Sequence, residues 1–202
     1  MNRPPLPRVH AITDELIARR PSLDRIARDI TSAGPQRIAF HARGRELTGT
    51  DHLELAGRLP PLLFVNDRLD IALATSAVGV QLAHRSLSVA DARRLGPHWW
   101  IGRSVHNLPE AQAALAQTAD YLLVGPVFPT ATHPDREPVG VELVARIAAL
   151  GGGRPVIAIG GVTPDRVPEL RAAGAYGVAA IRALWDAADP AAAAKAMLEA
   201  FE

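Results

Sequence analysis

Apolar residues in this chain form short runs, and glycine, proline or small polar residues bound each run. Short β-branched runs with such boundaries are typical of strands buried on both faces. Three of these runs lie in glycine-rich surroundings: Tyr121-Leu-Leu-Val-Gly-Pro-Val-Phe-Pro-Thr130, Pro155-Val-Ile-Ala-Ile-Gly-Gly-Val162 and Tyr176-Gly-Val-Ala-Ala-Ile181. In all, the pattern predicts eight strands, at residues 9–13, 37–42, 62–65, 79–82, 99–104, 120–124, 156–159 and 177–181.

Between the strands, apolar positions recur with the 3.6-residue spacing of amphipathic helices. The predicted helices span residues 22–31, 50–58, 68–75, 88–94, 108–117, 140–150, 163–173 and 190–201. Ser22, Ser88 and Thr163 are expected to cap three of them. Strict alternation of strand and helix over residues 1–202 predicts a single-domain α/β fold, a (β/α)8 TIM barrel, with a doubly wound open sheet as the competing topology.

Composition narrows the function classes. An apolar fraction of 48% is ample for a closed core, and a net charge of +1 offers no basic field for nucleic acid. The absence of cysteine excludes disulfides, thiolate metal sites and a cysteine nucleophile. No signal-peptide pattern or membrane-length apolar stretch is present, so we expect a cytoplasmic chain without a membrane partner. The sequence leaves open whether the protein forms a homo-oligomer.

The polar residues of chemical interest follow the predicted strands, which is the catalytic face of such a barrel. After the second strand, alternation turns His41, Arg43 and Arg45 to one side. Two guanidinium groups on one face suit a phosphate or carboxylate, although a solvated charged loop would have the same composition.

Further candidates follow the third, fourth and fifth strands. Asn66 and Asp67 precede a helix, so we expect one of them to cap it and the other to meet substrate or Mg²⁺. Ser104 and His106 end the fifth strand, and His106 could act as an acid or base near neutral pH. Gln81 and His84 are weaker candidates, because any polar exit loop would explain them.

A long polar segment at residues 129–140 is interpreted as a flap over the mouth of the barrel. Thr130, Thr132 and His133 could donate hydrogen bonds to an anion there, and Gly140 could offer amides at a helix start. The glycine pair at 160–161 and the amides of Ala180 and Ile181 predict a phosphate site, since loops after strands seven and eight commonly bind phosphate.

Several of these segments together resemble one superfamily, that of thiamine phosphate synthase and thiazole tautomerase. The matching segments are His10-Ala-Ile-Thr-Asp14, the Arg43/Arg45 pair, Asn66-Asp-Arg-Leu-Asp-Ile-Ala-Leu73, Gly102-Arg-Ser-Val-His106, Gly125-Pro-Val-Phe-Pro-Thr130, Ala158-Ile-Gly-Gly161 and Gly177-Val-Ala-Ala-Ile181. The resemblance implies a (β/α)8 barrel that handles the thiazole phosphate half of thiamine. In the synthase, a pyrimidine diphosphate ionises with the help of Mg²⁺ and the thiazole nitrogen captures the carbocation. In the tautomerase, proton transfers aromatise a thiazole carboxylate phosphate without metal.

The chain departs from both patterns. Synthases usually carry Gln-x-Arg-x-Lys where this chain has His41, Arg43 and Arg45, and Gly-Gln-Glu-Asp where it has Ala83-His-Arg-Ser86. Ser86 thereby replaces a metal ligand, and His133 replaces the synthase's flap lysine. The tautomerase pattern has His-x-Arg-x-Arg, as here, but places its acid/base histidine where this chain has Pro126.

On this balance the resemblance implies, first, a metal-independent thiazole tautomerase-like isomerase that needs no cofactor and acts on a small phosphorylated thiazole. His106, His41 or His133 would move the proton. Substrate would bind Arg43, Arg45, Asn66, Ser104, Thr130 and Thr132, and its phosphate would bind Gly140, Gly160, Gly161, Ala180 and Ile181. The alternatives are a divergent synthase that uses Mg²⁺ at Asp67, and a non-catalytic thiazole phosphate binder or regulator.

Overall fold

Eight parallel strands close into a barrel in the computed structural model, which describes residues 3–130 and 136–202. The strands follow one another around the ring in sequence order, and β8 pairs with β1 to close it, with Val9 opposite Val178. The strands are β1 (Val9–Ile12), β2 (Ile38–Ala42), β3 (Leu63–Asn66), β4 (Gly79–Leu82), β5 (Trp100–Val105), β6 (Tyr121–Val124), β7 (Val156–Ile159) and β8 (Gly177–Ala180). The predicted (β/α)8 barrel is therefore confirmed, and the open sheet is excluded.

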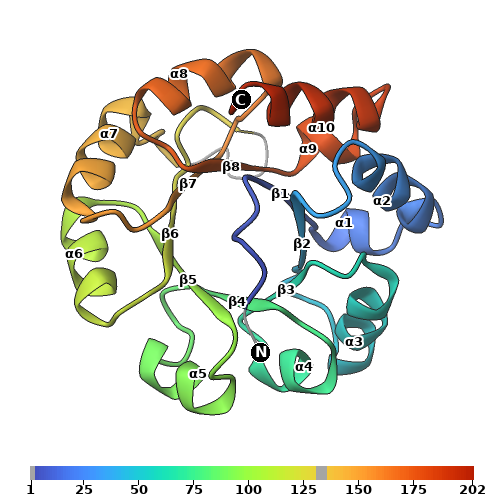
Figure 1. The fold of residues 1–202 in the computed structure, drawn as a ribbon. Coiled ribbons are helices and arrows are strands. Elements are labelled where there is room, and N and C mark those ends of the chain that lie inside the picture. Colours follow the sequence, from blue (N-terminus) through green and yellow to red (C-terminus); the bar gives the residue numbers. More distant parts are fainter. Residues whose placement is uncertain (1–2, 131–135) are drawn as a thin grey trace.

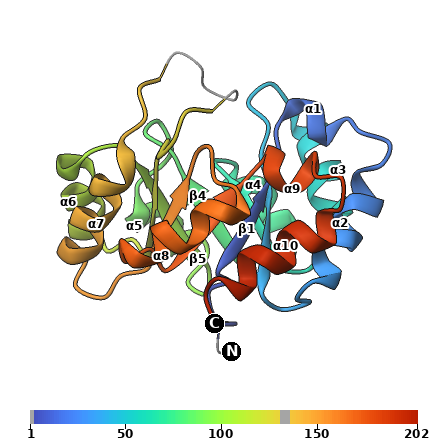
Figure 2. The same ribbon diagram turned by 90° about the horizontal axis from the view of Figure 1, so that it is seen from above.

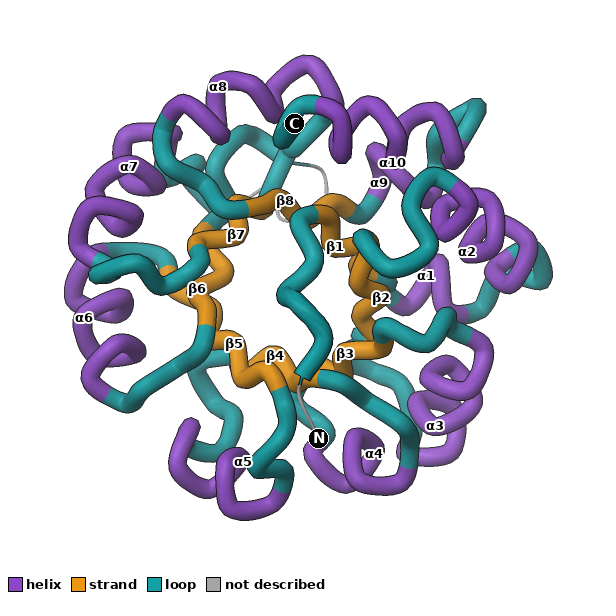
Figure 3. The backbone as a smooth tube through the Cα atoms, in the orientation of Figure 1, coloured by secondary structure: helices purple, strands orange, loops and turns teal. Residues whose placement is uncertain are grey.

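Helices form the outer layer around this ring (Figures 1 and 3). They are α1 (Glu15–Ala18), α2 (Leu23–Ser32), α3 (Gly49–Arg58), α4 (Leu69–Ala74), α5 (Val89–Leu95), α6 (Leu108–Ala116), α7 (Gly140–Leu150), α8 (Val167–Ala172), α9 (Arg182–Trp185) and α10 (Pro190–Glu199), with a 3₁₀ turn at Pro164–Arg166. Among the described residues, no helix combines the length and apolar character needed to span a bilayer.

Every predicted strand and long helix is confirmed to within a few residues, but local capping differs from the expectation. Ser88 caps α5 by accepting the N–H of Asp91 at 3.1 Å. Ser22 and Thr163 form no cap hydrogen bond, so those two expectations are wrong. The backbone of Ser22 lies near φ −85°, ψ 2°, outside the extended region that a capping side chain needs. The short helices α1 and α9 were not predicted, because four residues give too little periodicity.

The barrel interior is filled by side chains from alternate strand positions, together with Leu6 of the N-terminal segment. The apolar members of this inner cluster are Leu6, Ile12, Ala39, Phe64, Tyr121, Leu123, Ile157 and Ala179. Two histidines, His10 and His41, lie among them with no exposed surface. The larger core lies outside the ring, between strands and helices. The interior is thus a packed core and not a channel.

The segment before β1 crosses the opening of the barrel at the amino ends of the strands (Figures 1 and 3). Leu6 inserts into the interior with 4% exposure. The carbonyl oxygens of Pro4 and Leu6 accept hydrogen bonds from Trp100 Nε1 at 2.9 Å and the Tyr176 hydroxyl at 2.7 Å. We call residues 3–7 the plug, because they seal this end of the barrel. In the side view, this end lies opposite the described segments 125–130 and 136–139, between β6 and α7 (Figure 2).

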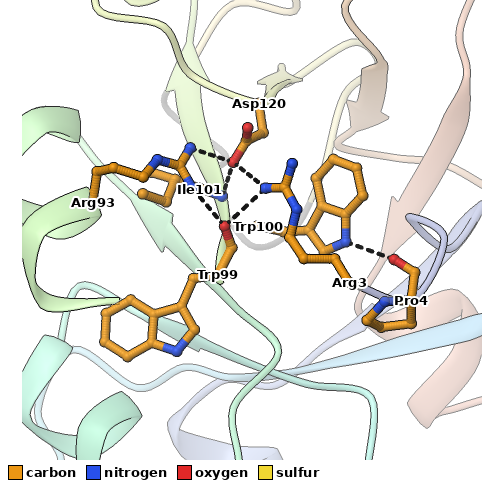
Figure 4. Close-up of polar contacts among 7 residues, drawn as sticks. All are labelled: Arg3, Pro4, Arg93, Trp99, Trp100, Ile101 and Asp120. Atoms are coloured by element: carbon orange, nitrogen blue, oxygen red, sulfur yellow. Dashed lines mark hydrogen bonds and ion pairs between the residues drawn. The ribbon is translucent and has the colours of Figure 1, made fainter. Parts of the chain in front are cut away.

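One carboxylate fixes the plug to the barrel wall (Figure 4). Asp120 Oδ2 accepts from Arg3 Nη1 at 2.9 Å, Arg93 Nη2 at 2.6 Å and the N–H of Ile101 at 2.8 Å. Both arginines also donate to the carbonyl of Trp99, and Arg3 stacks over Trp100 at 4.0 Å. Because Asp120 is only 8% exposed, its three donors replace most of its hydration.

Gly102 in β5 gives a first stability prediction. A Cβ there would overlap the ring of Tyr121 and Oε1 of Gln81, both in the barrel interior. Gly102→Ala is therefore expected to lower the free energy of unfolding by about 2–3 kcal/mol, measured by urea denaturation. Gly57 in the last turn of α3 has open space around its Cα, so Gly57→Ala should instead raise stability by about 0.5 kcal/mol. Equal effects of the two variants would contradict the packing argument.

Removal of the Asp120 carboxylate should loosen the plug. Asp120→Ala leaves the Ile101 N–H without its acceptor and two arginines without their carboxylate, with only the Trp99 carbonyl remaining between them, and we expect a loss of about 2–3 kcal/mol in urea denaturation. Asp29→Ala removes an acid from an exposed pair with Arg25 on α2 and should cost no more than about 0.5 kcal/mol. A loss as small for Asp120 as for Asp29 would show that the plug does not depend on this contact.

Candidate active site

A cavity of about 630 Å³ opens at the carboxyl ends of the strands, and we call it the mouth. Side chains from the ends of all eight strands, or from the loops that follow them, line it. This placement agrees with the rule that barrel enzymes build their sites on this face. A second hollow of about 500 Å³ at the opposite end is more open, and its Arg3 and Arg93 are already engaged by Asp120.

The loop after β2 brings two arginines to the mouth. Arg43 and Arg45 both line it, and the loop is held by Thr13, whose hydroxyl donates to the carbonyl of Arg43 at 2.8 Å. The carboxylate of Glu15 accepts the N–H groups of Arg45 and Glu46. The sequence predicted the position of these arginines, although β2 ends at Ala42 and the loop carries them, not the strand.

The environment of Arg43 favours an anionic ligand. Burial, and next the charge of Arg45, lower the pKa of Arg43 below its ordinary value, yet an arginine keeps its proton at any physiological pH. Within residues 3–130 and 136–202, no carboxylate lies within ion-pair distance of its guanidinium. Glu15, Asp14 and Asp67 act on this partly buried cation only from beyond that distance, so an anion in direct contact with it in the mouth would offset more of its desolvation.

Asp67 has a different local role from the one expected. The N-cap position of α4 is Arg68, whose side chain makes no cap bond, so neither Asn66 nor Asp67 caps that helix. Asp67 adopts φ 62° and its Oδ1 accepts the N–H of Ala83 at 3.0 Å and the Ser86 hydroxyl. It therefore orders the loop after β4, while the residue itself lines the mouth.

His41 does not reach the mouth. It has no exposed surface, does not line the cavity, and contacts His10 and Asn66 inside the barrel. The prediction that His41 transfers a proton to a substrate is therefore wrong: alternation correctly turned it inward but did not show how deep in the barrel it lies. Asn66, one strand over, does line the mouth.

Ser104 and His106 line the mouth from β5 and the residue that follows it. Ser104 Oγ accepts from Gln81 Nε2 at 2.9 Å, so the strand β4 fixes its orientation. His106 Nδ1 contacts the carbonyl of Gly125, which can only accept, so Nδ1 carries the proton and Nε2 faces Arg136 at 3.4 Å. His106 is accordingly held in one tautomer at the rim.

The predicted phosphate residues meet at the mouth with one exception. Gly160, Gly161, Ala180 and Ile181 all line it, from β7, β8 and their exits. Gly160 and Gly161 have φ of 99° and 63°, and a Cβ on either would approach Pro126 or Pro129 to within 2.6 Å. Only glycine fits such a close approach at positive φ.

Gly140 is the exception. It is not among the lining residues, and its N–H donates to the carbonyl of Val127 at 3.1 Å. Since that amide is occupied, the expectation that it binds phosphate is wrong in this conformation. Thr130 lines the mouth, whereas Thr132 and His133 lie outside the described residues.

Three lining arginines were not anticipated from the sequence: Arg136, Arg166 and Arg182. Arg166 donates to the carbonyl of Gly161 at 2.6 Å and packs on Phe128 at 4.6 Å. Arg182 pairs with Asp14 at 2.6 Å. Arg182 directly follows the last strand run, which is a signal that could have identified it. Arg166 is the last residue of a 3₁₀ turn, whose geometry the sequence does not reveal.

The family model described as Thiamine monophosphate synthase matches residues 12–184. A thiamine-phosphate synthase of Mycobacterium sp. (strain JLS) is 42% identical over 175 residues, which cover 86% of this chain and 77% of that protein. The solved thiamine phosphate pyrophosphorylase of Pyrococcus furiosus superposes with a TM-score of 0.77 at 29% identity, over 96% of this chain and 95% of that one.

A 3-hexulose-6-phosphate synthase of Salmonella typhimurium, with a TM-score of 0.73 at 12% identity, covering 96% of this chain and 98% of that one, shares only the fold. The relatives at 42% identity are named synthases, which overturns the expectation of a thiazole tautomerase-like isomerase. The departures at His41, Arg45, Ser86 and His133, on which that expectation depended, were outweighed by similarity over the whole chain. By the match of its sequence and fold, this chain belongs to the thiamine monophosphate synthase family.

Proposed function

We propose that this protein is a thiamine-phosphate synthase, a transferase that joins a pyrimidine methyl diphosphate to a thiazole phosphate and releases diphosphate. Family membership supports the reaction class. The observation that carries the proposal for this chain is that one mouth is lined by two separate sets of groups whose chemistry suits anions. Arg43 and Arg45 follow β2, while the glycine pair 160–161 and the amides at 180–181 belong to β7 and β8, with β1 between.

The two sets suit the two substrates. The Arg43 and Arg45 side chains hold the diphosphate, which has the higher charge, and the amides of Gly160, Gly161, Ala180 and Ile181 hold the thiazole phosphate. Asn66, Ser104 and Thr130 orient the rings between them. As the bond between the methylene carbon and the diphosphate oxygen breaks, the arginines stabilise the negative charge on the leaving group. The thiazole nitrogen, already in place, forms the new bond to that carbon.

The family implies Mg²⁺, and the described lining of the mouth offers one carboxylate for it. Among the described residues no cluster of three acidic or histidine side chains could hold a metal alone. Asp67, the one described carboxylate lining the mouth, has Oδ1 engaged by Ala83 and Ser86 and a second oxygen remaining. Mg²⁺ is commonly bound by one or two carboxylates together with substrate phosphates, so Asp67 would hold the ion with the diphosphate. The ion would supply charge neutralisation of the leaving group.

No residue needs to carry a proton in this reaction. The proton-transfer roles expected for His106, His41 and His133 belonged to the isomerase and are withdrawn with it. His106 instead fixes the carbonyl of Gly125 at the rim, beside Arg136. Its place on the lining makes it a contact for a substrate ring or phosphate.

The first test is synthase turnover. Purified protein with both substrates should form thiamine phosphate and diphosphate in the presence of Mg²⁺, and should lose that activity in EDTA. Ser86→Asp adds a second carboxylate beside Asp67 and should lower the Mg²⁺ concentration needed for half-maximal rate by about tenfold. Binding of both substrates without any product at saturating Mg²⁺ would refute the synthase assignment and favour a non-catalytic binder.

A second test concerns the arginine set. Arg43→Met removes charge-assisted hydrogen bonds to the diphosphate, and we expect inorganic diphosphate to bind about 10–100-fold more weakly by calorimetry. Arg85→Met makes the same change of net charge on the loop after β4, at an exposed residue that does not line the mouth. That control should change affinity by less than about threefold. Equal weakening in both variants would mean that Arg43 acts through general charge and not by contact.

A further inference from the structure

Two buried histidines and Asn66 form a continuous line of hydrogen bonds through the barrel interior, from the plug to the mouth. His10 Nε2 lies 3.0 Å from the carbonyl oxygen of Pro7. His10 Nδ1 lies 2.8 Å from His41 Nε2, and His41 Nδ1 lies 2.9 Å from Oδ1 of Asn66. Neither histidine has exposed surface, and the proposed reaction uses neither of them.

The number of hydrogens in this line decides how Asn66 is oriented. Three contacts need three hydrogens, but two neutral imidazoles carry one N–H each. The carbonyl of Pro7 can only accept, and so can an amide oxygen at Asn66. The third hydrogen must therefore come either from a second proton on one ring or from the amide nitrogen of Asn66.

The surroundings oppose a second proton on either ring. His41 stacks on Phe64 with 5.0 Å between ring centroids, and His10 meets Phe64 and Tyr121 at 5.6 and 5.9 Å. Burial lowers the pKa of His41 to about 4, with the charge of Arg43 adding to the effect against the Asn66 contact. Burial, and then the neighbouring His41, hold the pKa of His10 well below its ordinary value. Both rings are therefore neutral near pH 7.

We propose that Asn66 turns its amide nitrogen toward His41 and its carbonyl oxygen toward the mouth, and that His10 and His41 are positioning residues that fix this orientation. Asn66 then donates to His41 Nδ1, His41 Nε2–H donates to His10 Nδ1, and His10 Nε2–H donates to Pro7. Every contact in the line has one hydrogen. The two ends of a carboxamide have nearly the same shape, so this rotation keeps the packing around Asn66.

The orientation has a consequence for the ligand. Asn66 lines the mouth, and its outward amide atom has no hydrogen-bond partner among the described residues. With oxygen outward, the residue accepts and cannot donate, so it selects a ring that carries an amino or N–H donor. A ring that offers only an acceptor at that point would place its lone pair against that of the Asn66 oxygen, and the two would repel. This last step rests on the proposed function, whereas the orientation of Asn66 does not.

The orientation is tested on the free protein by NMR of 15N-labelled histidine side chains. We expect His10 and His41 both to be neutral with the proton on Nε2, unchanged between about pH 6 and 8. His52, whose Nε2 contacts the carbonyl of Ala42 at 3.0 Å outside the line, is an internal reference for that tautomer. Detection of an imidazolium, or of a proton on Nδ1 of either ring, would overturn the proposal whether or not the protein has synthase activity.

Asn66→Asp gives an independent readout. A carboxylate only accepts, so the missing hydrogen must then come from a ring, and one histidine of the pair should remain an imidazolium at pH 7. An unchanged neutral pair in this variant would contradict the hydrogen count. If the variant does not fold, the tautomers of the wild-type protein decide the question.

A matched pair of substitutions at position 41 tests the positioning role. Glutamine can accept from Asn66 and donate to His10, so His41→Gln should bind the aminopyrimidine diphosphate within about threefold of wild type. His41→Leu breaks the line and should weaken that binding by about tenfold or more, with affinity for inorganic diphosphate unchanged. Equal behaviour of the two variants toward the aminopyrimidine would refute the role. Absence of turnover in the wild type would refute the synthase assignment alone.

Discussion

Closure of the parallel barrel is the constraint on which the rest of this structure depends. A closed ring leaves no strand edge to pair, but it encloses an interior that side chains must fill completely. Here the filling includes aromatic rings and two imidazoles, and the plug seals the amino end of the strands. The mouth lies at the carboxyl end, where the described residues leave a cavity. The candidate site and the plug thus lie at the two ends of the same packed interior.

The polar groups inside the barrel must find their hydrogen-bond partners within this packed interior. A buried imidazole must satisfy both ring nitrogens, and only neighbours on adjacent strands or on the plug can do so. Pro7 is suited to one end of the line because its carbonyl accepts while proline has no N–H to compete. Asn66 is suited to the other end because an amide can both donate and accept. The same reasoning explains why Asp120 collects three donors where the plug meets β5.

Most of the fold was predictable from the sequence, and the reasons are physical. Buried parallel strands such as residues 121–124 and 156–159 are continuous apolar runs, and their helices are amphipathic, so both patterns are strong. Helices of four residues and caps such as Thr48 on α3 depend on backbone angles that the pattern does not show. The depth of His41 was missed because alternation gives the side of a strand and not the distance from its end. The choice of reaction was wrong because single departures such as Ser86 were given more weight than similarity over the whole chain.

The carbonyl of Pro7 sets the direction of the hydrogen bonds inside the barrel. With both rings neutral, as proposed, each hydrogen in the line points away from the mouth and toward the carbonyl of Pro7. Residues 10 and 41 can then be exchanged only for groups with a donor at one end and an acceptor at the other. In a barrel redesigned for another ligand, replacing the mouth residues alone would leave this polarity in place. Whether Asn66 presents a donor or an acceptor to the ligand thus depends on a carbonyl group at the opposite end of the barrel.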